Sequence, residues 1–277
     1  MKNIKNILIP VDFSTCAKNA VRYGVSLAQT LKARLFLLNA YEYPIGMVEM
    51  SYAGNNDFYQ QIEEDAHIEM EVLERNLLYG TGIEYYTICK AGPTLDSICK
   101  AVEEYHIEMV LMGTHSKSNV DKILFGGNTA GVLGKFDLPV FAIPEQAHFS
   151  RFDNFVLAYD FLCYKEQSVI EPLLALARAN NATIHVLHVG DKNLDSQDID
   201  ADNGSWISEC LKDVKHAYHF IQGEEVETAI WQYTKEEHAD LLALKPRKKR
   251  SLLDRLFSKS LTRTMVYHPH LPLLILQ

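Results

Sequence analysis

The sequence has no apolar run that approaches the roughly 18 residues a membrane-spanning helix needs. Residues Met1 to Asp12 are a short charged lead into an apolar run, too short for a secretory signal with a cleavage site. The five cysteines are odd in number, widely spaced and never arranged as C-x-x-C, which argues for a reducing compartment. These absences predict a cytoplasmic protein with free, mostly buried thiols, including an inert Cys16 at the expected start of a helix.

An excess of basic charge is also absent. The chain carries 27 Lys and Arg against 36 Asp and Glu, for a net charge of -9. An acidic surface offers no general attraction to nucleic acid or to a membrane, so neither is an expected partner. Any site for an anion must therefore be local.

Signatures of catalysis and of metal binding are missing as well. The sequence contains no G-x-S-x-G, no P-loop and no H-E-x-x-H. His185 and His188 are three residues apart on an expected strand, so they should point to opposite faces. The other close histidine pairs lack a nearby cysteine or carboxylate pattern: His216 with His219, and His268 with His270. We predict no catalytic residue and no metal site.

The chain does contain an internal repeat. Its 277 residues, 47% hydrophobic and 23% charged, have the length and composition of two globular domains. The apolar run that ends in Asp12 recurs as the run that ends in Asp160, and helical apolar spacing follows each. Both halves close on a proline-led apolar strand. The offset between matched segments falls along the chain, so the second copy is shorter where it matches 42–84.

The repeat predicts an α/β fold. Continuously apolar strands that alternate with helices indicate two tandem open parallel five-stranded sheets with helices on both faces, a Rossmann-like architecture. The expected domains are 1–146 and 152–277, joined by a short polar linker from Pro144 to Phe152. In the first half, strands and helices are expected in alternation near 6–12, 15–31, 34–41, 57–79, 84–90, 93–105, 108–113, 127–135 and 139–143.

A candidate phosphate cradle follows the fourth expected strand. Gly113 leaves this strand, a small polar loop follows, and Gly126 with Gly127 opens a helix. Ligands of open α/β sheets bind at the carboxyl ends of strands, glycines let backbone N–H groups approach an anion, and a helix N-terminus favours negative charge. Glycines that only make turns would give the same spacing, so the spacing leaves both interpretations open.

These segments resemble the universal stress protein family. Its members carry G-x-x-G-x9-G-[S/T] between the fourth strand and the fourth helix, with an Asp at the end of the first strand. In this sequence Asp12 follows Ile9-Pro10-Val11, and the four motif positions hold Gly113, Ser116, Gly126 and Gly127. The similarity covers nearly the whole chain as two copies, and ATP-binding members of the family imply an adenine-nucleotide site here, with or without magnesium.

The resemblance also implies roles for individual residues. Asp12 would lie near the ribose and the base. The base pocket would be lined by Pro10, Val11 and Ala40, with Met112 nearby. The ribose and phosphates would be surrounded by Gly113, His115, Ser116, Gly126, Gly127, Asn128 and Thr129. Two departures matter: Ser116 replaces a glycine and disfavours positive φ, and Gly127 replaces a hydroxyl donor. Backbone donors survive both changes, and Thr129 offers a nearby hydroxyl.

The second half departs much further from the motif. Asp160 is kept, but the four motif positions hold Lys245, Lys248, Ser258 and Lys259. Without glycines, close backbone approach to a triphosphate is not expected there. The basic run 245–250 is interpreted as a solvated loop, with capture of an acidic partner or phosphorylated ligand as the alternative.

Three functions are compatible with these observations. The favoured one is a non-enzymatic stress regulator that binds ATP or another adenine nucleotide in its first half and changes its protein partners. The alternatives are a scaffold of the same fold that binds no nucleotide, and a slow ATPase. Single-domain relatives commonly pair through their final strands, so Val140–Ile143 and Leu273–Leu276 should lie antiparallel in an internal pseudo-dimer. Pairing of whole chains as a homodimer is compatible with this arrangement but is not required.

Overall fold

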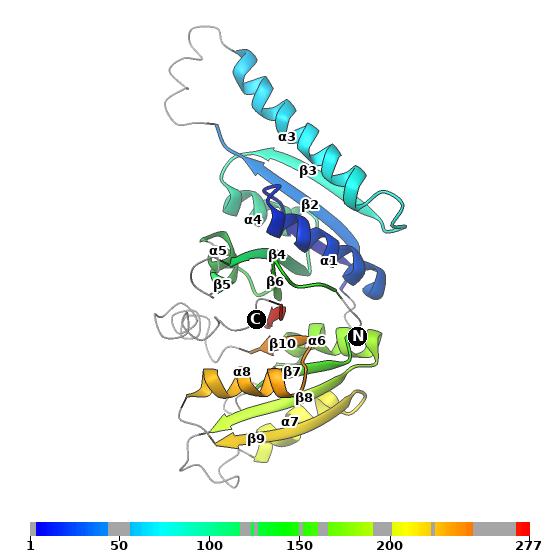
Figure 1. Ribbon diagram of the computed structural model, residues 1–277, viewed down its shortest axis with the longest axis vertical. Helices are drawn as coiled ribbons and strands as arrows, with labels where there is room; N and C mark the ends of the chain where they lie inside the picture. Colours follow the sequence, from blue (N-terminus) through cyan, green and yellow to red (C-terminus); the bar gives the residue numbers. More distant parts are fainter. Residues whose placement is uncertain are drawn as a thin grey trace.

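The structure of the protein is a computed structural model, and it describes residues 4–43, 56–116, 123–124, 127–149, 152–159, 166–190, 201–222, 225–245 and 270–277. The described chain forms two α/β halves that meet in the middle of an elongated molecule (Figure 1). Among the described residues, no helix is long and apolar enough to cross a membrane.

The first half alternates strands and helices in the expected order. Its elements are β1 (Asn6–Pro10), α1 (Thr15–Leu31), β2 (Arg34–Tyr41), α3 (Asn56–Leu77), β3 (Tyr85–Ala91), α4 (Thr94–Glu104), β4 (Met109–Ser116), β5 (Ile123–Leu124), α5 (Gly127–Lys135) and β6 (Val140–Pro144). The short strand β5 was not expected from the sequence; it pairs antiparallel with the end of β4. All nine other elements lie within a few residues of their predicted positions.

The second half repeats this order. Its elements are β7 (Asn154–Ala158), α6 (Gln167–Asn180), β8 (Thr183–Gly190), α7 (Ala201–Leu211), β9 (Lys215–Gln222), α8 (Val226–Glu236), β10 (Leu241–Leu244) and β11 (Leu273–Ile275). Helix α7 has 11 residues where its counterpart α3 has 22. The predicted shortening of the second copy is therefore confirmed.

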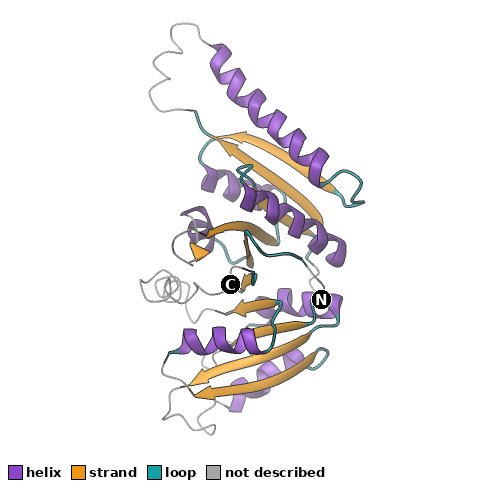
Figure 2. Cartoon of the chain, viewed as in Figure 1, coloured by secondary structure: helices purple, strands orange, loops and turns teal. Residues whose placement is uncertain are grey.

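The two predicted sheets form one continuous sheet. The strand order is β3-β2-β1-β4-β6-β11-β10-β7-β8-β9, parallel within each half (Figure 2). The halves join where β6 and β11 run antiparallel, with Phe141 opposite Leu274. This pairing confirms the predicted pseudo-dimer. It corrects the picture of two separate sheets, because each final strand completes the hydrogen bonding of the other's edge.

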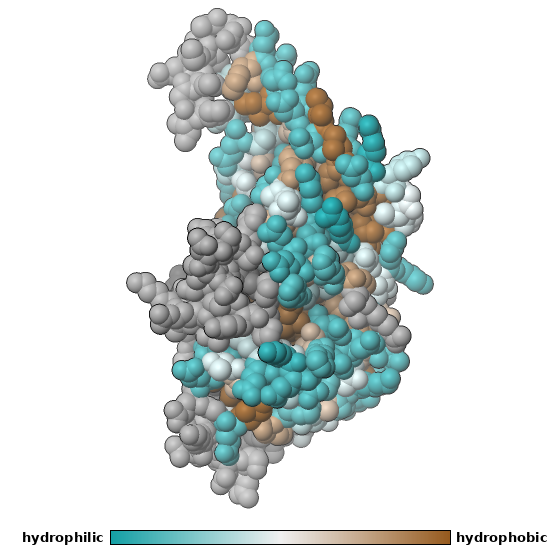
Figure 3. All heavy atoms as spheres, in the orientation of Figure 1, coloured by the Kyte–Doolittle hydropathy of each residue, from teal (hydrophilic) through white to brown (hydrophobic). Residues whose placement is uncertain are grey.

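Helices cover both faces of the sheet. Helices α1 and α3 pack on one face of the first half, and α4 and α5 on the other. The core on the α1 face runs without interruption into the second half, where α1 also contacts α6. In the view of Figure 3 the described surface is mostly hydrophilic, with hydrophobic side chains gathered in the upper part along α3. Ile68 and Val72 of this helix are 55% and 43% exposed.

The predicted polar linker is an aromatic joint in the structure. Phe149 and Phe152 pack edge-on, with ring centroids 5.1 Å apart. Both contact Tyr23 of α1, and Phe152 also packs on Phe155 of β7. Phe152 is only 2% exposed. These ring contacts hold the end of the first half against the start of the second half, so Phe149 and Phe152 are packed residues.

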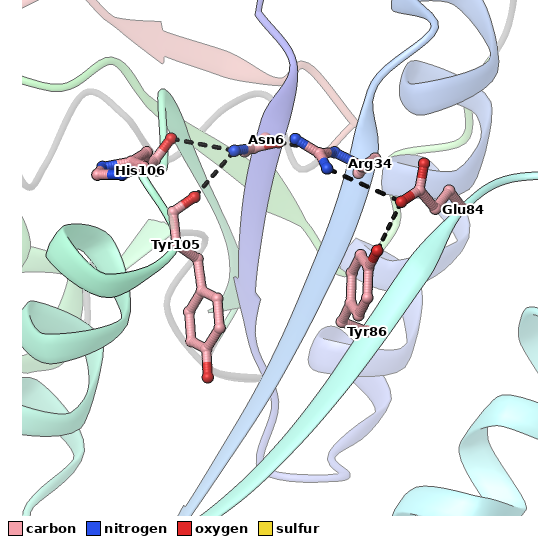
Figure 4. A network of polar contacts seen from close by, with 6 residues as sticks. All are labelled: Asn6, Arg34, Glu84, Tyr86, Tyr105 and His106. Atoms are coloured by element: carbon pink, nitrogen blue, oxygen red, sulfur yellow. Dashed lines mark hydrogen bonds and ion pairs between the residues drawn. The ribbon is translucent and has the colours of Figure 1, made fainter.

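A polar network ties the strands together at their amino ends (Figure 4). The Asn6 amide donates to the carbonyls of Tyr105 and His106 and accepts from Arg34 Nε at 3.0 Å. Arg34 also faces Glu84 at 3.8 Å, and that carboxylate accepts from the hydroxyl of Tyr86. The network joins β1, β2 and β3 to the α4–β4 turn, so the edge opposite the candidate site is firmly held.

Candidate functional site

The candidate site lies where the strand order of the first half reverses. From β1 the chain moves outward to β2 and β3, and then returns to place β4 on the other side of β1. The carboxyl ends of two strands flanking such a switch point form the usual ligand crevice of open α/β sheets. Because the crossover helices run back along the sheet, the N-termini of α1 and α5 face this same edge.

Asp12 lies just beyond β1 with its carboxylate exposed. It accepts hydrogen bonds from both the backbone N–H and the hydroxyl of Ser14. Ser14 in turn caps α1, accepting from the Ala17 N–H at 3.3 Å. Phe13 between them has φ +60, an uncommon conformation for a non-glycine residue. The turn thus holds Asp12 at the mouth of the crevice, next to a helix N-terminus.

Apolar residues form one wall of the crevice. Val11 is 4% exposed, and its N–H donates to the Leu38 carbonyl, which continues the β1–β2 ladder past the end of the strand. The buried Asn39 amide donates to the Val11 carbonyl at 2.8 Å. Pro10 and Ala40 are half-buried beside them. Met112, at 6% exposure, belongs to the core on the far side of the sheet.

Gly113 has a packing reason to be glycine. A Cβ placed there would meet the Cys16 carbonyl oxygen at 2.6 Å and the Ala17 nitrogen at 3.0 Å. Strand β4 therefore passes directly against the first turn of α1. Only glycine permits this approach, with or without a ligand. Gly113 lies inside β4, so close packing and not a turn accounts for this glycine, and the approach also brings the N-terminus of α1 close to the end of β4.

Thr114 was not singled out by sequence reasoning. Its side chain is 2% exposed, and its Oγ1 finds no hydrogen-bond partner among the described residues. Buried hydroxyls normally make a hydrogen bond. A buried hydroxyl without one, near the end of a strand, indicates a position where a polar ligand atom could bind. On α5, Thr129 is 3% exposed and Asn128 is exposed. The hydroxyl of Thr129 is therefore turned inward, and Asn128 is the accessible polar side chain there.

His115 and Ser116 lie in β4 and pair with Leu124 and Ile123 of β5. Ser116 is thus an extended strand residue and does not adopt the positive φ that the motif comparison expected. The hairpin with β5 keeps the strand extended, so serine costs nothing in backbone conformation here. Gly126 lies outside the described residues, while Gly127 is the first residue of α5.

Cys16 follows the first residue of α1 and is 3% exposed. Burial raises the pKa of its thiol, and a hydrogen bond with Ser14 Oγ at 3.1 Å only partly offsets this. The thiol is therefore protonated at neutral pH, as the sequence predicted. The other cysteines of the described chain are free too: Cys89, Cys99 and Cys210.

The equivalent crevice of the second half contains the protein's own side chains. Tyr159 stands where Val11 stands, and its ring stacks with that of Trp206 from α7. Lys245, at the position of Gly113, is 7% exposed, and its ammonium lies 5.1 Å from the centre of the Trp206 ring. The first residue of the basic run is therefore buried and not solvated. Asp160 and the rest of that run lie outside the described residues.

The histidines of the second half are arranged as their spacing predicts. His188 Nδ1 donates to the Tyr159 carbonyl, 3.1 Å away, and thereby replaces Asn39 of the first half. His185 lies on the opposite face, against His219 and Tyr233. In the described part of the chain, no three His, Cys, Asp or Glu side chains are placed to hold a metal ion.

Comparisons with known proteins agree with this architecture. The sequence profile of the universal stress protein family matches residues 3–144 and again 151–277. A universal stress protein of Methanocaldococcus jannaschii is 27% identical over 157 residues, which cover 51% of this chain and 96% of that protein. A second one from the same organism is 19% identical over 141 residues, covering 51% of this chain and 82% of the relative.

Solved structures share the two-half arrangement. A universal stress protein from Archaeoglobus fulgidus superimposes with a TM-score of 0.79 at 21% identity, covering 100% of this chain and 99% of that one. A putative universal stress protein from Pseudomonas aeruginosa gives 0.61 at 15% identity, covering 99% and 93%. At these identities the likeness concerns the fold alone. The two profile matches span nearly the whole sequence, and the chain therefore belongs to the universal stress protein family, with two copies of the family's domain in tandem.

Proposed function

We propose that the first half binds an adenine nucleotide between the ends of β1 and β4, and that the protein is a regulator and not an enzyme. The observation that carries the proposal is the difference between the two crevices. In the first half Asp12 is exposed at the switch point, whereas in the second half Tyr159, Trp206 and Lys245 occupy the equivalent place. A ligand would therefore enter only the first.

The residues of the first crevice suit a nucleotide. The wall of Pro10, Val11 and Ala40 offers an apolar surface for a base, and the exposed Asp12 carboxylate can accept from ribose hydroxyls. The N-terminus of α5 supplies backbone N–H groups for phosphate, helped by the exposed Asn128 amide. The orphaned Thr114 hydroxyl lies at the end of the same strand as Gly113. The proposal does not require magnesium.

A regulatory role is proposed because the side chains named at the crevice are not arranged for catalysis. Asp12 Oδ1 accepts from Ser14, and the nearby Cys16 thiol is buried and protonated. Neither group is arranged as a general base or as a nucleophile with a base beside it. Binding would act by closing the crevice and changing the surface that a protein partner contacts. A slow ATPase stays the less favoured alternative.

Isothermal titration of the full chain with ATP, ADP and AMP tests the proposal. We expect one nucleotide per chain for the wild type and markedly weaker binding for Asp12→Ala. Asp160→Ala is the matched control, since the repeat places it at the same position of the second half, and it should leave binding unchanged. Thermal unfolding of Asp12→Ala separates lost binding from the lost support of the α1 cap, worth about 1 kcal/mol.

Two results would count against the proposal. If the wild type binds no nucleotide at millimolar concentration, the family's fold serves here as a nucleotide-free scaffold. If Asp160→Ala weakens binding as much as Asp12→Ala does, the second crevice is the site. Steady phosphate release that disappears in Asp12→Ala would replace the regulator with the ATPase.

A further inference from the structure

Two histidines face each other beneath helix α8 in the second half. His185 of β8 and His219 of the edge strand β9 stack with ring centroids 5.3 Å apart, and Nδ1 of the first lies 3.3 Å from Nε2 of the second. Tyr233 of α8 closes the group, with its hydroxyl 3.2 Å from the same Nδ1. The side chain of His185 is only 12% exposed. The group is therefore compact and largely withdrawn from water.

The first half shows what this place normally holds. The position of His185 is occupied by Phe36, because both are third in strands that share one register with the first strand of their half. Phe36 stacks on Tyr86 at 5.1 Å and also contacts Tyr105. The position of His219 is occupied by Ile88. An apolar contact under the crossover helix has thus been replaced by two imidazoles.

All the charged or titratable groups that face the pair can be named within the described chain. Strand β9 contributes His219, and α8 contributes Tyr233 together with Glu237 just beyond its end. Glu237 Oε2 is 3.9 Å from His185 Nδ1, and this carboxylate is more than one-third exposed. On the other side β7 presents Val156, which is fully buried. Among the described residues, the partly solvated Glu237 is the carboxylate placed to compensate for added positive charge.

Protonation of the pair is unfavourable in the folded state. Burial lowers the pKa of His185 below its ordinary value of 6.5; Glu237 raises it and His219 lowers it further. Two imidazolium ions 3.3 Å apart would also repel each other. In the unfolded or opened state His185 titrates near the ordinary value of 6.5. As pH falls below 6.5, the open state binds more protons than the closed state, so closure of α8 loses stability.

We propose that His185 and His219 form a pH-sensitive latch that holds α8 on β8 and β9 at neutral pH and releases it in mild acid. Proton uptake from solvent is the only chemical step. Release would loosen the second half while the first half, with its apolar contact, stays closed. The latch does not depend on nucleotide binding. It lies in the second half, on the opposite face of the sheet from Trp206 and Tyr159, whereas the nucleotide is proposed to bind in the first half.

Hydrogen exchange read by mass spectrometry tests the latch on the full chain at pH 7.5 and pH 5.5. After correction for the intrinsic pH dependence of exchange, protection of α8 and β8 should fall roughly threefold or more in the wild type, since opening is coupled to proton binding. Protection of α1 and β2 should stay constant. His185→Phe, which installs the first-half residue, should abolish the acid-induced loss. His67→Gln, at an exposed histidine of α3, is the matched control.

A second measurement keeps the proposal testable if His185→Phe folds poorly. Imidazole NMR of the wild type should give His185 a titration midpoint below the ordinary histidine value of 6.5. The latch is wrong if the midpoint lies at or above 6.5. It is also wrong if α8 keeps its full protection at pH 5.5, or if His185→Phe loses as much protection in acid as the wild type does.

Discussion

The two halves share one frame and differ at the ends of their strands. Both register their second strand on the first in the same way, and both end their first long helix with a left-handed residue, Lys32 or Asn181. Even the side-chain hydrogen bond just after the first strand is retained. Asn39 donates to the Val11 carbonyl, and His188 donates to the Tyr159 carbonyl. The difference therefore lies in side chains and not in backbone topology.

What the difference teaches is how one copy can lose a crevice without losing its fold. In the first half glycine at 113 lets α1 begin directly against β4. In the second half the matching position holds Lys245, whose ammonium lies over the ring of Trp206. The frame is carried by buried strands, which leaves the strand ends free to diverge.

Separating the halves should produce the largest change. A fragment of residues 1–149 exposes the edge of β6, which in the full chain pairs with β11. An exposed apolar edge invites pairing, so we expect the fragment to dimerise and the full chain to stay independent of concentration at this seam. Sedimentation velocity checks the expectation. The control is the same fragment with Val140→Lys. If the fragment without this substitution is monomeric, the idea is contradicted.

Removing the aromatic joint should be nearly as severe. Phe152→Ala deletes a ring that contacts Tyr23, Phe149 and Phe155, at a cost of about 3–5 kcal/mol of unfolding free energy. Phe58→Ala, at a residue 40% exposed on α3, should cost less than about 0.5 kcal/mol. Urea unfolding measures both. Equal losses would mean that residues 149–152 behave as a tether after all.

Restoring the family's hydroxyl should sharpen the contrast between the crevices. Gly127→Ser adds a donor at the start of α5, and a hydrogen bond to a charged phosphate is worth about 1.5–3 kcal/mol. ATP affinity should rise tenfold or more in titration calorimetry. Ser116→Gly should change little, because residue 116 is an extended strand residue. A gain from Ser116→Gly alone would show that the loop rearranges when nucleotide binds.

A smaller effect is expected at the position where the halves differ most. Gly113→Ala forces a methyl group against the Cys16 carbonyl and should cost about 1–3 kcal/mol of stability. Lys245→Ala, its counterpart, removes a cation–π contact worth about 0.5–2 kcal/mol. Thermal unfolding compares the two. No loss in Gly113→Ala would mean that α1 can shift away from β4 at little cost.

Much of this architecture follows from the sequence because long apolar strands and helical periodicity report burial directly. Element order, the repeat and the shorter second copy were predicted in this way, whereas the β6–β11 pairing was predicted from the resemblance to the family. The aromatic joint was missed because Phe149 and Phe152 sit among polar residues, where local composition indicates a loop. Their packing depends on Tyr23, which is distant in sequence.

The details of the candidate site were less accessible for the same reason. The sequence predicted that Gly113 leaves a strand, whereas in the fold it lies within β4, with Cys16 packed against it. Nothing local distinguished Lys245 from its solvated neighbours, since its burial depends on Trp206 from another helix. Thr114 had no signal beyond its place after a motif glycine. The sequence placed Ser116 in a loop and missed its place in β4, because the partner strand β5 has only two residues.

The seam between β6 and β11 also has a consequence for abundance in the cell. An assembly of two separate chains dissociates when it is diluted, so its function sets a minimum copy number. Here both members of the pair are made in a single round of translation and in equal amounts. The pairing of the two halves is therefore insensitive to how scarce the protein is.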